Sequence, residues 1–165
     1  MKANFLSAAE AAAMIRDGTT VLTVGMTLIG AAESIFKAIE ARFLETDSPK
    51  SLTLVHASGM SDRIRGNQHF AYEGMTKRII GGHWGLAPKW MDLITGDKVE
   101  AFNLPQGQLV QLYRSMACGL PGKMSKVGLG TYIDPRIEGG KMNPRTKKLP
   151  DIVEVMNYDG EEYLF

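Results

Sequence analysis

The sequence of 165 residues has few cysteines, no long apolar run and almost no net charge, and each of these excludes a class of protein. Its single cysteine, Cys118, excludes an internal disulfide and suits a reducing, cytoplasmic location. No apolar run approaches the roughly 20 residues that span a bilayer, so no membrane association is expected. The 19 Lys and Arg nearly cancel the 18 Asp and Glu, so no strong field would attract nucleic acid. What is present, 44% hydrophobic and 22% charged residues, is typical of a globular protein.

Cysteine and histidine often carry chemistry, but here their positions favour structural roles. Cys118 lies in MACG, a pattern typical of a helix end, and we expect a buried structural thiol. His56, His69 and His83 are widely spaced and lack clustered Cys or carboxylate neighbours in the sequence, so no metal site is predicted. His83 in GGHWG stands out, because the flanking glycines would let it and Trp84 approach a ligand closely.

Helical and strand patterns alternate along most of the chain. Ser7 and Glu10 form the S-x-x-E pattern of a capping box, and Gly18 can close the helix that follows. Apolar residues at helical spacing from Ala32 to Phe43 predict a second helix. Strands are expected at 19–25, 51–57, 77–82 and 98–103, and further helices at 88–96 and 108–119. This order predicts an α/β fold with an open, mostly parallel sheet and crossover helices on its faces.

The last fifteen residues, DIVEVMNYDGEEYLF, are predicted to form a β-hairpin around Asp159-Gly160, a strong two-residue turn signal. The second strand ends on Leu164 and Phe165, whose burial would contribute roughly 1.5 to 3 kcal/mol each. If this apolar strand end were exposed, that stabilisation would be lost, and its unpaired backbone groups could pair with another strand. We therefore expect the hairpin to be incomplete, with the sheet continuing in another polypeptide or a missing remainder. Such an exposed edge also makes an oligomer the expected state. The alternative is a natural terminus covered by a loop.

Three loops are candidates for a functional site. The turn VGMTLIGAAE, with Gly25 and Gly30, resembles an anion-binding helix N-terminus. It matches neither the Walker loop nor the G-x-G-x-x-G motif. The alternative is that the two glycines serve only to form the turn. The Gly-rich segment 128–141 is either a ligand loop or a connector. In NLPQG, Gln106 is either an ordinary turn residue between a strand and a helix or a residue whose side-chain amide binds a substrate. No nucleophile is paired with a base at a recognisable spacing, so the residues alone do not establish catalysis.

Three longer segments together resemble the amino-terminal half of family I coenzyme A transferases. They are RIRGNQHFAYEGMTKRIIGGHWGLAPK, VEAFNLPQGQLVQLYR and KVGLGTYIDPRIEGGKMN. The sequence is most similar to the single-chain propionate or acetate type, over essentially its whole length. The combination of GGHWG, NLPQG and GLGT-x-x-DPR-x-EGGK is highly specific, although each piece alone is weak. The resemblance implies one amino-terminal, alpha-type transferase domain at 1–165, truncated at its carboxy-terminal end.

The resemblance also implies an activity. Members of this family move coenzyme A from an acyl-CoA to a free carboxylic acid by a ping-pong route through a glutamyl-CoA thioester, and we expect short-chain acyl-CoA as the donor here. The nucleophilic glutamate belongs to a carboxy-terminal half or beta-type subunit, and Glu138 does not match its motif. Coenzyme A would be a substrate, and no permanently bound cofactor is expected. A non-catalytic module that binds acyl-CoA or carboxylate is the alternative, because fold does not determine function.

The resemblance assigns roles to individual residues. Gln106 in PQG is expected to help form the oxyanion hole, and the VGMTLIG turn is expected near the acyl group and carboxylate. The predicted substrate-binding residues are Gly25, Met26, Thr27, Gly30, His83, Gly107, Gly128 and Gly130.

Overall fold

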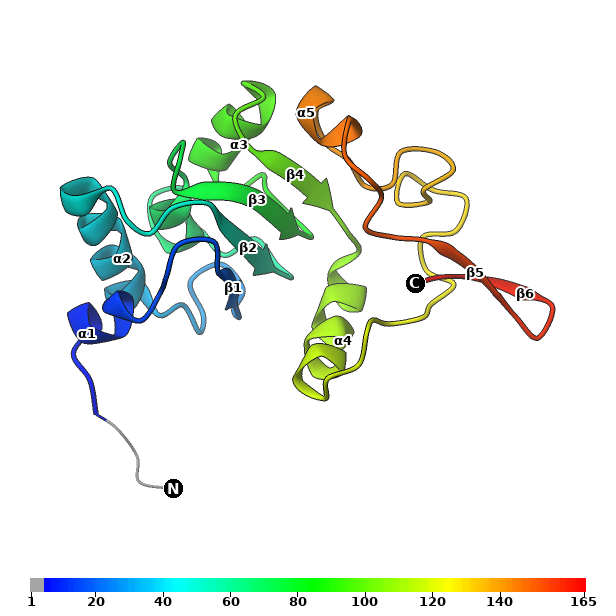
Figure 1. The fold of residues 1–165 in the computed structure, drawn as a ribbon, viewed down its shortest axis with the longest axis horizontal. Helices are drawn as coiled ribbons and strands as arrows, with labels where there is room; N and C mark the ends of the chain where they lie inside the picture. Colours follow the sequence, from blue (N-terminus) through cyan, green and yellow to red (C-terminus); the bar gives the residue numbers. More distant parts are fainter. Residues whose placement is uncertain (1–4) are drawn as a thin grey trace.

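The structure is a computed structural model that describes residues 5–165, and Figure 1 shows a twisted sheet with helices beside it and a separate hairpin. The helices and strands in chain order are α1 (Ala8–Ala13), β1 (Thr20–Thr23), α2 (Glu33–Thr46), β2 (Leu52–His56), the 3-10 helix η1 (Gly66–Phe70), β3 (Thr76–Gly81), α3 (Pro88–Thr95), β4 (Glu100–Asn103), α4 (Gln106–Ala117), α5 (Pro144–Lys147), β5 (Val155–Tyr158) and β6 (Glu161–Leu164).

The main sheet has four parallel strands in the order β1-β2-β3-β4. Each strand therefore lies beside the next one in the sequence, and each connection must cross over one face of the sheet. The connections contain α2, η1 and α3 in turn. This arrangement confirms the predicted α/β fold with an open parallel sheet.

The core lies between the sheet and these connections. The strand register aligns Val21, Leu54, Ile79 and Ala101 in one row across the sheet. This row packs against apolar side chains of α1, α2, η1 and α3. Leu54 and Ile79 are fully buried, and each such side chain contributes roughly 1.5 to 3 kcal/mol by leaving water. The crossover helices thus cover the same face.

The first helix begins as predicted but ends early. The Glu10 N–H donates to Ser7 Oγ at 3.2 Å, and the Ser7 N–H donates to Glu10 Oε2 at 2.7 Å, which confirms the capping box. The helix ends at Ala13, so the expected closure by Gly18 is wrong. Gly18 instead adopts a positive φ of 71° and donates its N–H to the Lys50 carbonyl at 2.8 Å. A long-range bond to the segment before β2 determines its conformation.

Helix α4 begins two residues earlier than predicted and leaves most of its surface uncovered. Pro105, with φ −59°, precedes the helix, and its carbonyl accepts from the Leu109 N–H at 3.1 Å. Only Leu109 and Ser115 of this helix are buried. Cys118 follows the last turn and is exposed, so the expected buried thiol is wrong. The MACG pattern correctly marks a helix end, but no other element among residues 5–165 buries Cys118.

The hairpin of β5 and β6 confirms the predicted turn. Asp159 and Gly160 have φ values of 52° and 78°, the two successive left-handed residues that a tight two-residue turn requires. The expected bare apolar end is not observed. Leu164 is only 4% exposed, and its N–H and carbonyl pair with Ser125 at 2.8 and 2.9 Å. A loop of the same chain thus covers this strand end.

Candidate active site

The carboxyl ends of β1 to β4 lie along one edge of the sheet, and a loop leaves each of them. We call these loops, residues 24–30, 57–61, 82–86 and 104–105, together with the first two residues of α4, 106–107, the carboxyl edge. Ligands of open parallel sheets bind outside the carboxyl ends of the strands. All the predicted site residues except Gly128 and Gly130 belong to the carboxyl edge.

The four loops contact one another in sequence order. The Thr27 N–H in the first loop donates to the Gly59 carbonyl in the second at 2.9 Å. Gly59 in turn lies against His83 of the third loop, because a Cβ at Gly59 would lie 2.6 Å from His83 Nδ1. The fourth loop meets the third at Gly82, where a Cβ would lie 3.0 Å from Gln106 Cβ, and its Leu104 N–H donates to the carbonyl of Gly81, the last residue of β3, at 3.0 Å. The carboxyl edge is therefore one continuous surface.

Gly82 determines how closely Gln106 approaches this surface. A Cβ at Gly82 would lie 3.0 Å from the Cβ of Gln106 and would overlap the Ala57 carbonyl oxygen. Only glycine lets the start of α4 pack this tightly on the ends of β2 and β3. Sequence reasoning missed this role of Gly82. The one signal for it was the glycine pair that opens GGHWG.

Gln106 is the first residue of α4 and is exposed. The helix N-terminus carries partial positive charge from its free N–H groups, which favours negative charge nearby. A Cβ at Gly107 would meet no atom within 4 Å, so the space beside this next residue of the helix is open. Within residues 5–165 no hydrogen bond engages the Gln106 amide, which leaves its N–H groups available to a substrate oxygen.

The loop after β1 is a tight turn, and several of its backbone N–H groups already donate hydrogen bonds within the protein. The Met26 N–H donates to the Ile29 carbonyl at 3.1 Å, and the Ile29 N–H donates back at 2.9 Å. The Thr27 N–H is bonded to Gly59. An anion at this turn would therefore need donors other than these three amides. Gly25 lets the turn close, since a Cβ there would lie 2.6 Å from the Ile29 carbonyl oxygen.

His56, the last residue of β2, contacts two loops of the carboxyl edge. Its ring is buried, and Nδ1 donates to the Ser58 carbonyl at 2.5 Å. Burial, helped by the nearby His83, lowers the pKa of His56 to about 4 despite that hydrogen bond, so the ring is neutral near pH 7. The Trp84 ring packs edge-on against it at 4.3 Å, in space that Gly81 leaves free. His56 thus holds the second and third loops together.

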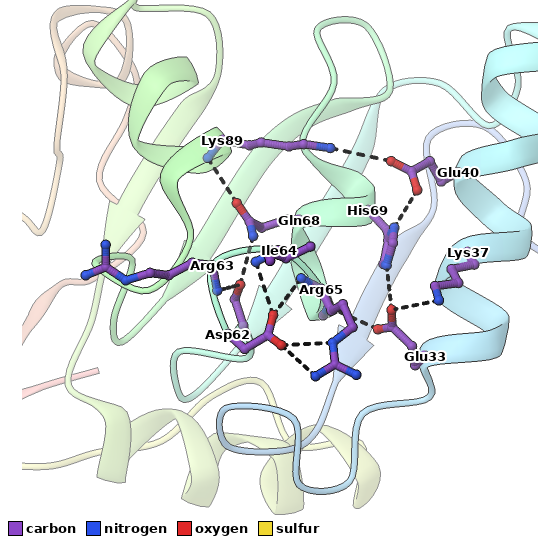
Figure 2. Close-up of polar contacts among 12 residues, drawn as sticks. Glu33, Lys37, Glu40, Asp62, Arg63, Ile64, Arg65, Gln68, His69 and Lys89 are labelled. Atoms are coloured by element: carbon purple, nitrogen blue, oxygen red, sulfur yellow. Dashed lines mark hydrogen bonds and ion pairs between the residues drawn. The ribbon is translucent and has the colours of Figure 1, made fainter.

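A polar network ties the loop after β2 to α2 (Figure 2). His69 of η1 points one ring nitrogen at each of two α2 carboxylates, with Nε2 2.8 Å from Glu33 Oε1 and Nδ1 2.5 Å from Glu40 Oε2. Burial alone would raise the pKa of Glu33, but hydrogen bonds from His69 and the Gly66 amide outweigh it and lower that pKa. Burial also opposes ionisation of Glu40, and bonds from Tyr72 and His69 outweigh it and lower its pKa.

The same network fixes the shape of the loop itself. Asp62 accepts the backbone N–H groups of Ile64 and Arg65 at 3.1 and 2.7 Å and the Arg65 Nε at 2.8 Å. These bonds lower the pKa of Asp62 to about 2. The Gln68 side chain donates to Ser61 Oγ at 3.0 Å and accepts the Lys89 N–H at 3.1 Å. The network therefore holds the loop that presents Gly59 to the carboxyl edge.

The two remaining predicted residues lie in a different loop. Gly128 packs against Leu164 of the hairpin, and the Gly130 N–H donates to Asp134 Oδ2 at 2.9 Å. The Arg136 guanidinium, with the Gly130 amide, holds the pKa of Asp134 well below its usual range. These contacts stabilise the loop, and a substrate role for Gly128 and Gly130 stays a prediction. Glu138, in the same loop, forms an ion pair with Lys147 at 2.8 Å.

The three histidines differ in their surroundings: His56 is buried and neutral, His69 is paired with carboxylates, and His83 is exposed at the carboxyl edge. Within the described part of the chain, no group of three or more His, Cys, Asp or Glu residues is placed to hold a metal ion. No helix among residues 5–165 is both long and apolar enough to cross a membrane.

Comparison with known proteins gives consistent results. The sequence model of the family described as Coenzyme A transferase matches residues 5–165. Caffeate CoA-transferase from Acetobacterium woodii is 45% identical over 99% of this chain and 31% of its own length. The acetate CoA-transferase alpha subunit of Escherichia coli K12 is 25% identical over 81% of this chain and 58% of its own length.

A crystal structure of the acyl-CoA transferase YdiF from Escherichia coli O157:H7 superimposes with a TM-score of 0.89 at 37% identity. The match covers 96% of this chain and 31% of YdiF. YdiF has also been solved as a thioester complex with CoA. The chain therefore spans just under a third of the length of these full-length relatives.

Proposed function

The chain belongs to the coenzyme A transferase family, and we propose that it forms the oxyanion-hole side of an acyl-CoA:carboxylate transferase. The exposed amide of Gln106 carries this proposal. It lies at the positive end of α4, on the carboxyl edge, and packs against Gly82, the residue before His83. A neutral amide suits the role, because it donates hydrogen bonds without competing for the charge of a carboxylate nucleophile.

The reaction proceeds by covalent catalysis. A glutamate oxygen attacks the thioester carbonyl, the C–S bond breaks, and an acyl-glutamyl anhydride and CoA thiolate form. The thiolate then attacks the glutamyl carbonyl, releases the carboxylate product and leaves a glutamyl-CoA thioester. An incoming carboxylate reverses these two steps. In each step the carbonyl oxygen gains negative charge, and the Gln106 N–H stabilises it. The glutamate comes from a carboxy-terminal half or beta-type subunit.

The substrates follow from this chemistry. Acyl-CoA and a free carboxylic acid are the two substrates, and no resident cofactor is required. The relatives named for caffeate and acetate support a carboxylic acid as acceptor. The relative named as an alpha subunit supports a partner polypeptide, and we propose that the assembled enzyme is oligomeric and cytoplasmic. The turn at Gly25 to Gly30 lies near the acyl group and the carboxylate.

A chimeric enzyme tests the proposal. Residues 1–165 would replace the matching part of the Acetobacterium woodii caffeate CoA-transferase, whose remaining sequence supplies the glutamate. Gln106→Ala should lower kcat by roughly 10²- to 10³-fold, the typical cost of one oxyanion-hole donor. Gln111→Ala, also exposed on α4, is the matched control and should leave kcat unchanged. Equal turnover in the Gln106→Ala enzyme and its parent would refute the proposal.

A further inference from the structure

His69 of η1 lies between two glutamates of α2, and each of its ring nitrogens faces one of them (Figure 2). Nε2 is 2.8 Å from Glu33 Oε1, Nδ1 is 2.5 Å from Glu40 Oε2, and the residue is only 8% exposed. Burial raises the pKa of each glutamate, but hydrogen bonds outweigh it and lower the pKa overall, so both are ionised at neutral pH. An ionised carboxylate only accepts, whereas a neutral imidazole donates from one nitrogen and accepts at the other. Two hydrogen bonds to these carboxylates therefore require a ring protonated on both nitrogens.

Two lysines also approach these carboxylates, but neither lysine is buried. Lys37 Nζ of α2 lies 3.7 Å from Glu33 Oε1, and Lys89 Nζ of α3 lies 3.6 Å from Glu40 Oε1. Their side chains are 60% and 47% exposed, so water screens both pairs. His69 thus supplies the buried positive charge of the cluster.

The other polar side chains of the cluster keep their charge near neutral pH. The Tyr72 hydroxyl donates to Glu40 Oε1 at 2.5 Å, and this bond, together with burial, raises the pKa of Tyr72. On the loop after β2, Asp62 and Arg65 pair with each other, with Arg65 Nη2 2.7 Å from Asp62 Oδ2. Histidine is the only side chain in this cluster whose type changes charge between about pH 5 and 8. A pH change in this range therefore acts on the cluster through the ring of His69.

The 3-10 helix η1 contacts the carboxyl edge through Met60. Glu33 also accepts the N–H of Gly66, the first residue of η1, at 3.0 Å. A Cβ at Gly66 would overlap the Met60 carbonyl oxygen, which accepts the Asn67 N–H at 2.8 Å. The Met60 side chain is fully buried, and a Cβ at Gly25 would lie 2.8 Å from its Cε. A shift of η1 would therefore move Met60 and with it the turn that begins at Gly25.

We propose that His69, protonated on both ring nitrogens, is a positioning residue that holds η1 against α2 and thereby fixes the first two loops of the carboxyl edge. Its effect on CoA transfer rests on the proposed function. The contact is complete when both glutamates are ionised and the ring carries two protons. As the pH rises, the ring loses one proton, and an unprotonated nitrogen then faces a carboxylate oxygen at hydrogen-bonding distance. The contact therefore weakens with rising pH, and the two loops should move with it.

Nitrogen NMR of the isotope-labelled 165-residue chain tests the protonation. The His69 ring, identified by its absence from His69→Gln, should carry a hydrogen on both nitrogens at about pH 6 and lose one as the pH rises. Glu40→Gln removes one charged partner and should lower the midpoint of this titration by about one pH unit or more. Glu33→Gln removes the other partner and should act in the same direction. Glu45→Gln is the matched control, exposed on the same helix, and should leave the midpoint within about 0.3 pH units.

The positioning role has two further readouts. In the same titration the backbone N–H signals of Gly59 and Thr27 should shift with the midpoint of the His69 ring. In the chimeric enzyme kcat should fall at this midpoint, and Glu40→Gln should move the fall to lower pH by the same amount. A merely structural cluster would lower the stability of the variants without moving the pH profile. Thermal unfolding of each variant confirms that it folds.

Each result decides one part of the proposal. An unprotonated ring nitrogen at about pH 6 would refute the doubly protonated contact, and equal midpoints in the parent and both glutamine variants would refute the pairing. Signals of Gly59 and Thr27 that do not follow the titration would refute the positioning role. Identical pH profiles of transfer in the parent and Glu40→Gln would refute the effect on the reaction. A chimera without turnover, whose His69 ring titrates as expected, would refute the proposed function alone.

Discussion

The region around the sheet, residues 8–103, and the region from α4 to Phe165 are stabilised in different ways. The first has a continuous apolar core, with side chains from the strands and from α1, α2, η1 and α3 in mutual contact. The second has few buried apolar side chains, chiefly Leu109 and Leu164. Figure 1 shows it as α4, long connections, a short helix and a hairpin on one side of the sheet.

The second region is attached mainly through buried polar groups. The Asn143 amide donates to the carbonyls of Ile94 and Val99 at 3.0 and 2.8 Å. Its oxygen accepts from the backbone and the hydroxyl of Thr146 at 3.1 and 2.5 Å. The Thr146 hydroxyl also accepts the Ala101 N–H at 2.7 Å. These two side chains join α5 to the end of α3 and to β4.

The difference has a functional consequence. An apolar core distributes its stabilisation over many contacts, each of which is weak and non-directional. A polar attachment depends on a few directional bonds and fails when one partner is removed. The first region therefore provides a rigid platform for the four loops of the carboxyl edge, whereas the second provides Gln106 on a helix, α4, that is largely uncovered within residues 5–165.

Asn143→Ala should have the largest effect on stability. It removes four hydrogen bonds, among them those of the Val99 carbonyl and the Thr146 N–H, at a cost of about 1 to 3 kcal/mol for each buried group left unsatisfied. We expect a total loss of about 3 kcal/mol or more in urea unfolding. Asn157→Ala, on the exposed hairpin, is the control and should change stability by less than about 0.5 kcal/mol. Similar losses in both variants would show that the second region does not depend on this polar attachment.

Glu40→Gln probes the main polar contact of the first region and should cost about 1 to 2 kcal/mol at neutral pH. The amide has the shape of the carboxylate but cannot accept from both Tyr72 and His69. The folded pKa of Glu40 is lowered from its ordinary value of 4.5. Its contribution is therefore complete above about pH 4.5 and is lost as the pH falls through the folded pKa.

The pH dependence of the Glu40→Gln effect is the measurement to make. Stability curves of the parent and the variant should differ at neutral pH and converge below about pH 4.5. Glu45→Gln, one turn further along α2 and exposed, is the control. A constant difference across this pH range would mean that shape, rather than charge, explains the loss.

Cys118→Ser should have the smallest effect. The thiol is exposed at the end of α4, so the change should alter the free energy of unfolding by no more than about 0.5 kcal/mol. In the folded chain the thiol should react with a disulfide reagent about as fast as in urea. Strong protection of the folded chain would show that the second region covers α4 more fully than the structure indicates.

Much of the fold could be predicted from the sequence, because it depends on interactions between residues close together in the chain. The capping box at Ser7, the helical spacing from Ala32 to Phe43 and the Asp159-Gly160 turn each act within a few residues. Seven of the predicted site residues came from the family motifs, and they lie together at the carboxyl edge because a parallel sheet brings the ends of its strands to one edge.

Other features depended on contacts between distant segments, and no local pattern predicts such contacts. Gly18 bonds to the segment before β2, so α1 ends earlier than its sequence suggests. Gly82 is required because Ala57 and Gln106 approach it from two other loops. Cys118 is exposed because nothing in residues 5–165 packs on the end of α4. The sequence by itself therefore determined the order of the helices and strands and the family motifs. Only the tertiary structure decided which side chains meet at the carboxyl edge and which apolar surface stays open, because burial depends on the arrangement of the whole chain.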